Sequence, residues 1–169
     1  MRFLLTLLMT FVLITGSATA KTVIKRVPKY NGPEITQVLV DKTKRKMYLL
    51  AGTKTIRKFK IDLGFTPAGH KFKQGDGRTP EGLYYIDRIN ENSRYFLSLG
   101  LNYPNTKDRA LADAAGVDPG GDIFIHGGPR YKGERGKRDW TAGCVSVSDR
   151  EMGWIYSMVK KGTPIFIKP

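Results

Sequence analysis

The residues 37–64 read QVLVDKTKRKMYLLAGTKTIRKFKIDLG, and the class of fold follows from their pattern. Two apolar runs, Val38–Val40 and Met47–Leu50, flank a polar turn at Asp41–Lys46. A third, alternating run occupies 56–61. Because short runs of this kind separated by turn residues are typical of hairpin-connected strands, the stretch predicts an antiparallel meander of three strands.

Outward from this meander, the chain continues as further strands and turns. The segment 64–82 is rich in Gly and Pro and predicts a loop long enough to be functional. Residues 149–160 have the spacing of a helix with one buried face, capped by Ser148 or Asp149. The sum is a mainly β domain with one or two short helices. The other expected elements are strands at 83–86, 95–101, 123–125 and 163–167 and a short helix at 106–115.

A length of 169 residues fits a single domain. Residues 1–20 have the pattern of a secretory signal peptide, with Arg2 before the apolar run 3–14 and small residues at the cleavage point. A retained membrane anchor is the alternative, but the run is shorter than the roughly 20 residues of a spanning helix. We expect a lead-in at 21–36, a folded domain at 37–169, a periplasmic location and no membrane span after cleavage.

The net charge of +14 indicates a polyanionic partner. Nucleic acid is the first interpretation of such a charge. Export would instead bring the protein to carboxylate-rich or phosphorylated envelope polymers, so we expect an envelope partner and no nucleic acid. A basic surface that is merely solvated is the alternative, because charge bears on solubility and encounter rather than on fold.

Cys144 is the only cysteine, so it cannot form an intramolecular disulfide. An odd cysteine in an exported protein is a candidate reactive thiol or an intermolecular linker, and an inert buried side chain is the alternative. It follows a small-residue turn and begins a β-branched strand, a position from which a side chain can face a cleft.

Two histidines are candidates for the base that a thiol nucleophile needs. His126 ends an apolar strand before Gly127, whereas His70 lies in the Gly- and Pro-rich loop, so His126 is the better base on placement. Backbone N–H groups around Gly143 and Cys144 are candidates for an oxyanion hole. Two His and one Cys do not supply the usual metal-ligand cluster, so neither a metal nor another cofactor is expected.

Several ordered motifs carry a family resemblance. A strand-ending Ile125-His126-Gly127 is followed by Thr141-Ala142-Gly143-Cys144 and the hydrophobic Val145. Together with 79–84 (TPEGLY) and 162–167 (GTPIFI), this pattern resembles the YkuD-type L,D-transpeptidase catalytic domain over nearly the whole chain after the lead-in. The resemblance implies a YkuD-like β-sandwich or barrel.

The resemblance also implies a two-step reaction on peptidoglycan stem peptides. Cys144 would attack the carbonyl of the third residue, release the terminal D-alanine and form a thioester. The acyl group would then pass to an amine, giving a 3–3 crosslink or attachment to an envelope protein, or to water. His126 would be the base and later the acid, and the Gly127 carbonyl would orient the imidazole.

This chain departs from the commonest family motif at two positions. Many members carry His where it has Ala142, and Asn or Arg where it has Ser146. Neither change removes the nucleophile or the base, and the Asp-Trp-Thr-x-Gly-Cys form is similar to that of a branch of small members. The candidate substrate-binding residues are Thr141, Ala142, Trp140, His70, and the two arginines Arg138 and Arg78, which would pair with a diaminopimelate carboxylate.

Alternatives remain open for these residues and for the function. A solvated loop residue is the alternative for His70, a packing role for Trp140, and an ordinary surface position for the arginines. The same Cys and His would serve a peptidoglycan hydrolase, acting as an amidase, L,D-endopeptidase or carboxypeptidase. A noncatalytic envelope-binding module would instead have a buried, unreactive Cys144.

Overall fold

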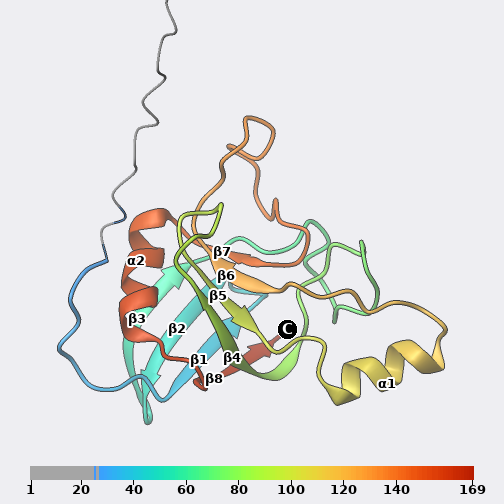
Figure 1. Ribbon diagram of the computed structural model, residues 1–169, viewed down its shortest axis with the longest axis horizontal. Helices are drawn as coiled ribbons and strands as arrows, with labels where there is room; N and C mark the ends of the chain where they lie inside the picture. Colours follow the sequence, from blue (N-terminus) through green and yellow to red (C-terminus); the bar gives the residue numbers. More distant parts are fainter. Residues whose placement is uncertain (1–24, 26) are drawn as a thin grey trace, which may run out of the picture.

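The structure is a computed structural model that describes residues 25 and 27–169. The expected signal peptide and the start of the lead-in lie outside the described residues. The described chain forms a sheet of eight strands with two helices (Figure 1), which confirms the mainly β fold. The strands are β1 (Gln37–Asp41), β2 (Lys46–Ala51), β3 (Lys54–Lys60), β4 (Gly82–Asn90), β5 (Ser98–Leu101), β6 (Phe124–His126), β7 (Val145–Ser146) and β8 (Pro164–Lys168), and the helices are α1 (Thr106–Ala114) and α2 (Asp149–Met158).

The strand order is β3-β2-β1-β8-β4-β5-β6-β7. The first three strands form the expected antiparallel meander, in register from Gln37 opposite Leu50 to Asp41 opposite Lys46. The last strand, β8, pairs parallel with β1 and antiparallel with β4. It therefore joins the meander to the half of the sheet that carries the His and Cys motifs.

The sheet curls until its two ends meet. Directly after β3, Asp62 and Ser146 of β7 exchange backbone hydrogen bonds of 2.9 and 2.8 Å. Two residues further on, the chain also pairs with Thr141, whose N–H donates to the Leu63 carbonyl at 3.1 Å. The segment that leads into Cys144 is thus held by the meander as well as by its neighbour β6.

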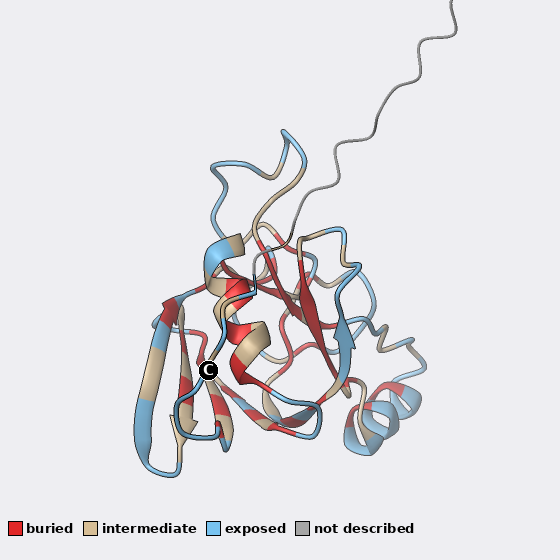
Figure 2. Cartoon of the chain, turned by 60° about the vertical axis from the view of Figure 1, so that its left-hand side comes forward, coloured by how far each residue is buried: buried red, intermediate tan, exposed pale blue. Residues whose placement is uncertain are grey.

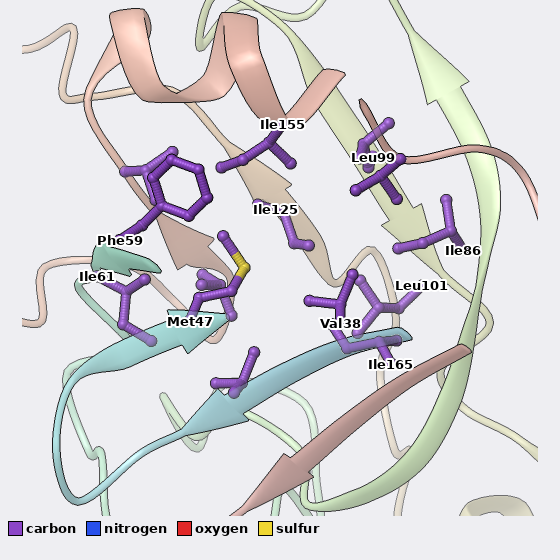
Figure 3. Close-up of a cluster of buried hydrophobic side chains, with 14 of the residues drawn as sticks. Val38, Met47, Phe59, Ile61, Ile86, Leu99, Leu101, Ile125, Ile155 and Ile165 are labelled. Atoms are coloured by element: carbon purple, nitrogen blue, oxygen red, sulfur yellow. The ribbon is translucent and has the colours of Figure 1, made fainter. Parts of the chain in front are cut away.

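One apolar core fills the inside of this curl (Figure 3), where side chains from the meander, from β4 to β6 and from α2 meet. Helix α2 begins at a capping box, in which Ser148 and Glu151 each satisfy a backbone N–H of the other. Its buried side includes Met152 and Ile155, whereas α1 is largely exposed (Figure 2). Burial of these apolar side chains is the main stabilising contribution to the fold.

Two buried lysines hold the Gly- and Pro-rich loop that precedes β4. The Lys42 ammonium donates to the carbonyls of Gly69 and Thr79 at 2.6 and 2.9 Å, and pairs with Glu81 at 2.7 Å. Lys71 pairs with Asp76 at 3.0 Å. Because a buried ammonium must be paired, the Lys42 contacts fix the loop against the end of β1, and the Lys71 pair holds a turn within the loop itself.

Candidate active site

Cys144 and His126 lie on neighbouring strand ends. Strands β6 and β7 run parallel, with Ile125 opposite Val145 and His126 opposite Ser146, so Cys144 enters β7 beside the end of β6. Both side chains line one pocket of about 570 Å³. Its other lining residues are Asn90, Asn92, Ser93, Arg94, Tyr95, Ser98, Asp122 and Phe124.

The Cys144 thiol is partly exposed in this pocket and donates to the Asp122 backbone carbonyl across 3.4 Å. Burial is the main cause that raises the pKa of the thiol to about 11; the Asp122 carboxylate acts in the same direction, and the Phe124 backbone N–H and Lys71 act in the opposite one. The resting thiol is therefore protonated at neutral pH. It needs a base to become a nucleophile.

The His126 ring is buried, at 5% exposure, and its Nδ1 lies 2.7 Å from the Gly127 carbonyl oxygen. A carbonyl can only accept, so Nδ1 carries the proton and Nε2 is left as the acceptor. The Ser146 hydroxyl donates to the same carbonyl at 3.1 Å. Burial lowers the pKa of His126, which keeps the imidazole neutral and able to take a proton at pH 7.

Two aromatic rings fix the plane of the imidazole. Tyr95 stacks on His126 at 4.6 Å between ring centroids, and Trp140 meets it edge-on at 5.5 Å. The Tyr95 hydroxyl donates to Glu134 at 2.7 Å, and Glu134 in turn accepts from the Arg130 backbone N–H. The long loop between β6 and β7 is thereby connected to the face of the candidate base.

The turn before Cys144 is held by side chains of its own motif. The Thr141 hydroxyl donates to the Cys144 carbonyl at 2.7 Å and accepts from the Gly143 N–H at 3.2 Å. Asp139 forms an ion pair with Arg45 at 2.8 Å and accepts from the Leu63 N–H at 3.0 Å. Because the Gly143 N–H already has an acceptor, it could join an oxyanion hole only by giving up its bond to Thr141.

The structure gathers most of the sequence-predicted site residues around this turn. His126 lines the same pocket as Cys144 and contacts Trp140. Ala142, in the turn before Cys144, is exposed. The Gly127 backbone contacts His126, and Gly143 packs against the backbone of Arg78. The Arg78 guanidinium lies instead near Gly69.

Two predicted site residues lie apart from Cys144. Arg138 is exposed and lines a different pocket. His70 accepts from the Glu81 N–H at 3.0 Å through Nδ1, and its Nε2 lies 3.3 Å from the Asp108 carboxylate. Asp108 is buried and also accepts from the Tyr84 hydroxyl at 3.0 Å, so His70 belongs to a network that ties the loop to α1.

We expect His70→Asn to lower the free energy of unfolding by about 1–2 kcal/mol, because it leaves polar partners in this network without their hydrogen bonds. The rate at which Cys144 is acylated should stay within about two-fold of the wild-type rate, since a change below ~0.4 kcal/mol in the barrier gives no more. Urea denaturation measures the first quantity and intact-mass kinetics the second. A large loss of acylation in a stably folded variant would show that His70 acts on substrate.

Sequence reasoning did not find Tyr95, Glu134 or Asp139 as parts of the site. Tyr95 and Glu134 reach His126 across separate loops, and no spacing in the sequence signals that contact. Ser146 could have been found, because residues two apart on a strand share a face, which places it with Cys144. Asp139 could have been found through its place in the Asp-Trp-Thr-x-Gly-Cys motif.

Two features are absent from the part of the chain that the structure describes. No group of three or more His, Cys, Asp or Glu side chains is arranged to hold a metal ion there. Nor does that part of the chain contain a helix long and apolar enough to cross a membrane.

A curled, mainly β domain with a His and a Cys in one pocket is the kind of structure that the sequence motifs implied. The family model of the YkuD L,D-transpeptidase catalytic domain matches residues 35–167. The chain therefore belongs to the YkuD family of L,D-transpeptidase catalytic domains, and the resemblance drawn from its motifs is confirmed.

Individual relatives agree with this assignment. A protein of Escherichia coli K12 named "Putative L,D-transpeptidase YafK" is 27% identical over 104 residues, covering 57% of this chain and 42% of that protein. The helical cell shape determining protein Pgp2 of Campylobacter jejuni, as its K307A mutant, superposes with a TM-score of 0.63 at 26% identity, covering 82% of this chain and 48% of that one. Bd1075 of Bdellovibrio bacteriovorus superposes with a TM-score of 0.56 at 26% identity, covering 80% of this chain and 48% of that one. The chain thus spans about half the length of these relatives or less.

Proposed function

We propose that this chain is a peptidoglycan L,D-transpeptidase that uses Cys144 to form a thioester with the third residue of a stem peptide. The observation that supports this most is that a protonated thiol and a neutral, Nδ1-anchored imidazole line one pocket. His126 supplies a nitrogen that can take the thiol proton, which the Asp122 carbonyl contacted by the resting thiol cannot do. Family membership supplies the substrate class.

In the first half-reaction, Nε2 of His126 takes the Cys144 thiol proton as the sulfur attacks the carbonyl carbon. The tetrahedral oxyanion then collapses, the bond between that carbon and the D-alanine nitrogen breaks, and the imidazolium returns the proton to the departing amine. The Gly127 carbonyl favours the imidazolium, because it accepts from Nδ1 throughout. The product is a thioester on Cys144 and free D-alanine.

In the second half-reaction, an acceptor amine attacks the thioester carbonyl. His126 removes a proton from the attacking nitrogen and the Cys144 sulfur leaves, recovering its own proton as the amide forms. The acceptor would be a second stem peptide, giving a 3–3 crosslink, or an envelope protein. Water in place of the amine would make the same site a hydrolase.

We place this activity in the periplasmic cell envelope, with peptidoglycan stem peptides as the partner. The K307A mutant of Pgp2, to which the chain is similar, is described as a helical cell shape determining protein. A contribution to cell shape is therefore part of the proposal. The N-terminal residues expected to direct export support the location.

The proposal is tested by incubating the purified protein with disaccharide-tetrapeptide fragments and following the products by mass spectrometry. We expect a crosslinked dimer and loss of D-alanine, with no reaction by Cys144→Ala. Hydrolysed monomers alone would assign the hydrolase instead. A Cys144 that titrates as an unassisted thiol, unchanged in His126→Ala, would favour the noncatalytic module.

The acylation rate should keep its full value at more acidic pH than an ordinary histidine would allow. Only neutral His126 can accept the thiol proton, and burial lowers the pKa of His126 below its ordinary value of about 6.5. The neutral base therefore persists as the pH falls, and the rate is lost only below about 6.5. Initial acylation rates measured from about pH 4.5 to about pH 8 show where the rate falls in acid. A rate that is half-maximal at or above about pH 6.5 would contradict the lowered pKa of His126.

A further inference from the structure

A second pocket of about 570 Å³ shares no lining residue with the pocket of Cys144. It lies where the β1–β2 turn, the end of β3, the start of the long loop after β6 and the end of β7 come together. We call it the basic pocket. Its lining residues are Lys44, Arg45, Lys46, Lys60, Ile61, Asp62, Gly128, Pro129, Arg138, Ser146, Val147, Ser148 and Glu151.

Positive charge dominates this pocket, because five of its lining residues are cationic and two are acidic. Both acidic groups already have partners, since Glu151 closes the capping box of α2 and Asp62 accepts from the Asp139 N–H. Among the described residues, Lys46, Lys60 and Arg138 form no ion pair. Within the part of the chain that the structure describes, the pocket therefore presents three cations without an ion-pair partner, from three separate segments of the chain, against two carboxylates that accept hydrogen bonds from uncharged groups.

Two of these cations repel each other. Lys46 and Lys60 are directly opposite in the β2–β3 ladder, so their side chains leave the same face of the sheet a short distance apart. Like charges in such a cross-strand pair are destabilising. The next pair on the same face of the ladder, Tyr48 and Lys58, adds a further cation there. An anion held between Lys46 and Lys60 would offset the repulsion.

We infer that the basic pocket binds carboxylates of a peptidoglycan strand outside the stem peptide that reacts. The choice of polymer rests on the proposed function, whereas the anionic class rests on the pocket itself. Ser146 lines the basic pocket and is two residues from Cys144, so the two pockets adjoin the same short segment, 144–146. Attachment at a second point raises the effective concentration of its stem peptides at the active site.

The test measures binding to insoluble peptidoglycan sacculi by sedimentation, with every variant carrying Cys144→Ala so that no thioester contributes. Lys46→Gln with Lys60→Gln should weaken binding about five-fold at low salt, the size expected for the loss of two exposed charge contacts. The matched control, Lys54→Gln with Lys161→Gln, removes the same charge from exposed positions outside this pocket and should bind as the parent does. Equal binding by the two double variants overturns the inference.

Sacculi whose carboxylates have been amidated identify the anion. The parent and the Lys46→Gln, Lys60→Gln variant should bind them alike, because the groups that the lysines contact are gone. If the parent still binds amidated sacculi five-fold better than the double variant, the pocket binds a phosphate group, and the inference that it binds carboxylates is wrong. The transfer assay on soluble fragments tests the proposed function separately, since these binding measurements do not need the thiol.

A charge reversal separates binding from folding. Lys60→Glu should weaken sacculus binding while raising the unfolding temperature by about 1–3 °C, because it replaces a like-charge cross-strand pair with an opposite-charge one. The two effects run in opposite directions, so misfolding cannot produce both. Unchanged binding, or a lower unfolding temperature, counts against the basic pocket as an anion site.

Discussion

Replacing His126 with asparagine is expected to slow thioester formation on Cys144 by about 100- to 10,000-fold, the usual contribution of a positioned general base. The thiol has a pKa of about 11, so at neutral pH almost none of it ionises without a base. Asparagine keeps a donor that can reach the Gly127 carbonyl but has no nitrogen to accept the proton. The acylation rate is measured by intact mass after mixing with a disaccharide-tetrapeptide.

The matched control is His70→Asn, which makes the same chemical change at the other histidine. It should acylate at close to the wild-type rate, because His70 lies in the Glu81 and Asp108 network away from the thiol. Near-wild-type acylation by His126→Asn would mean that another group takes the proton. Both variants should retain the wild-type far-ultraviolet circular dichroism spectrum.

The second large effect is expected from Gly143→Ala, which should lower the free energy of unfolding by about 2–5 kcal/mol and abolish measurable acylation. Gly143 has φ of +139°, a conformation that side chains rarely adopt. A Cβ there would lie 2.7 Å from the Arg78 carbonyl oxygen, which is backbone and cannot swing away, and 3.2 Å from Ile123 Cδ1. The turn must shift, and Cys144 moves with it. Urea denaturation measures the loss.

Gly82→Ala is the control that separates the two causes. Gly82 has φ of +120°, and a Cβ there would meet no atom within 4 Å. This variant should therefore lose only the backbone contribution, about 1–3 kcal/mol. The amount by which Gly143→Ala loses more unfolding free energy than Gly82→Ala measures the steric clash with Arg78. Equal losses in the two variants would show that the clash does not destabilise the protein.

Local patterns in the sequence predicted much of the fold. The runs in 37–60 predicted the meander, because strand pairing across short turns depends on neighbouring residues. Helix α2 was predicted to span 149–160 and occupies 149–158, and its cap is Ser148, which the sequence had offered together with Asp149. Both are cases in which a few adjacent side chains determine the structure.

The sequence could not place side chains that depend on distant segments. Arg138 and His70 were candidate substrate-binding residues; the structure places Arg138 at the basic pocket, and His70 in contact with Glu81 and with Asp108 of α1. Tyr95 and Glu134 approach His126 only through the assembled sheet and the loop after β6. Where these side chains point depends on tertiary packing between distant segments, and the residues next to them in the sequence do not indicate it.

The position of β8 has a consequence for the order of assembly. Its five residues stand between β1 and β4, so the meander and the half-sheet that carries Cys144 are joined along the strand order by 164–168, in addition to the contact of 62–64 with 141–146. Pairings over such long sequence separations close slowly, because the loop entropy is lost before the contacts form. A nascent chain lacking these residues cannot complete the sheet. The sheet that carries Cys144 is therefore complete only once synthesis has reached 164–168.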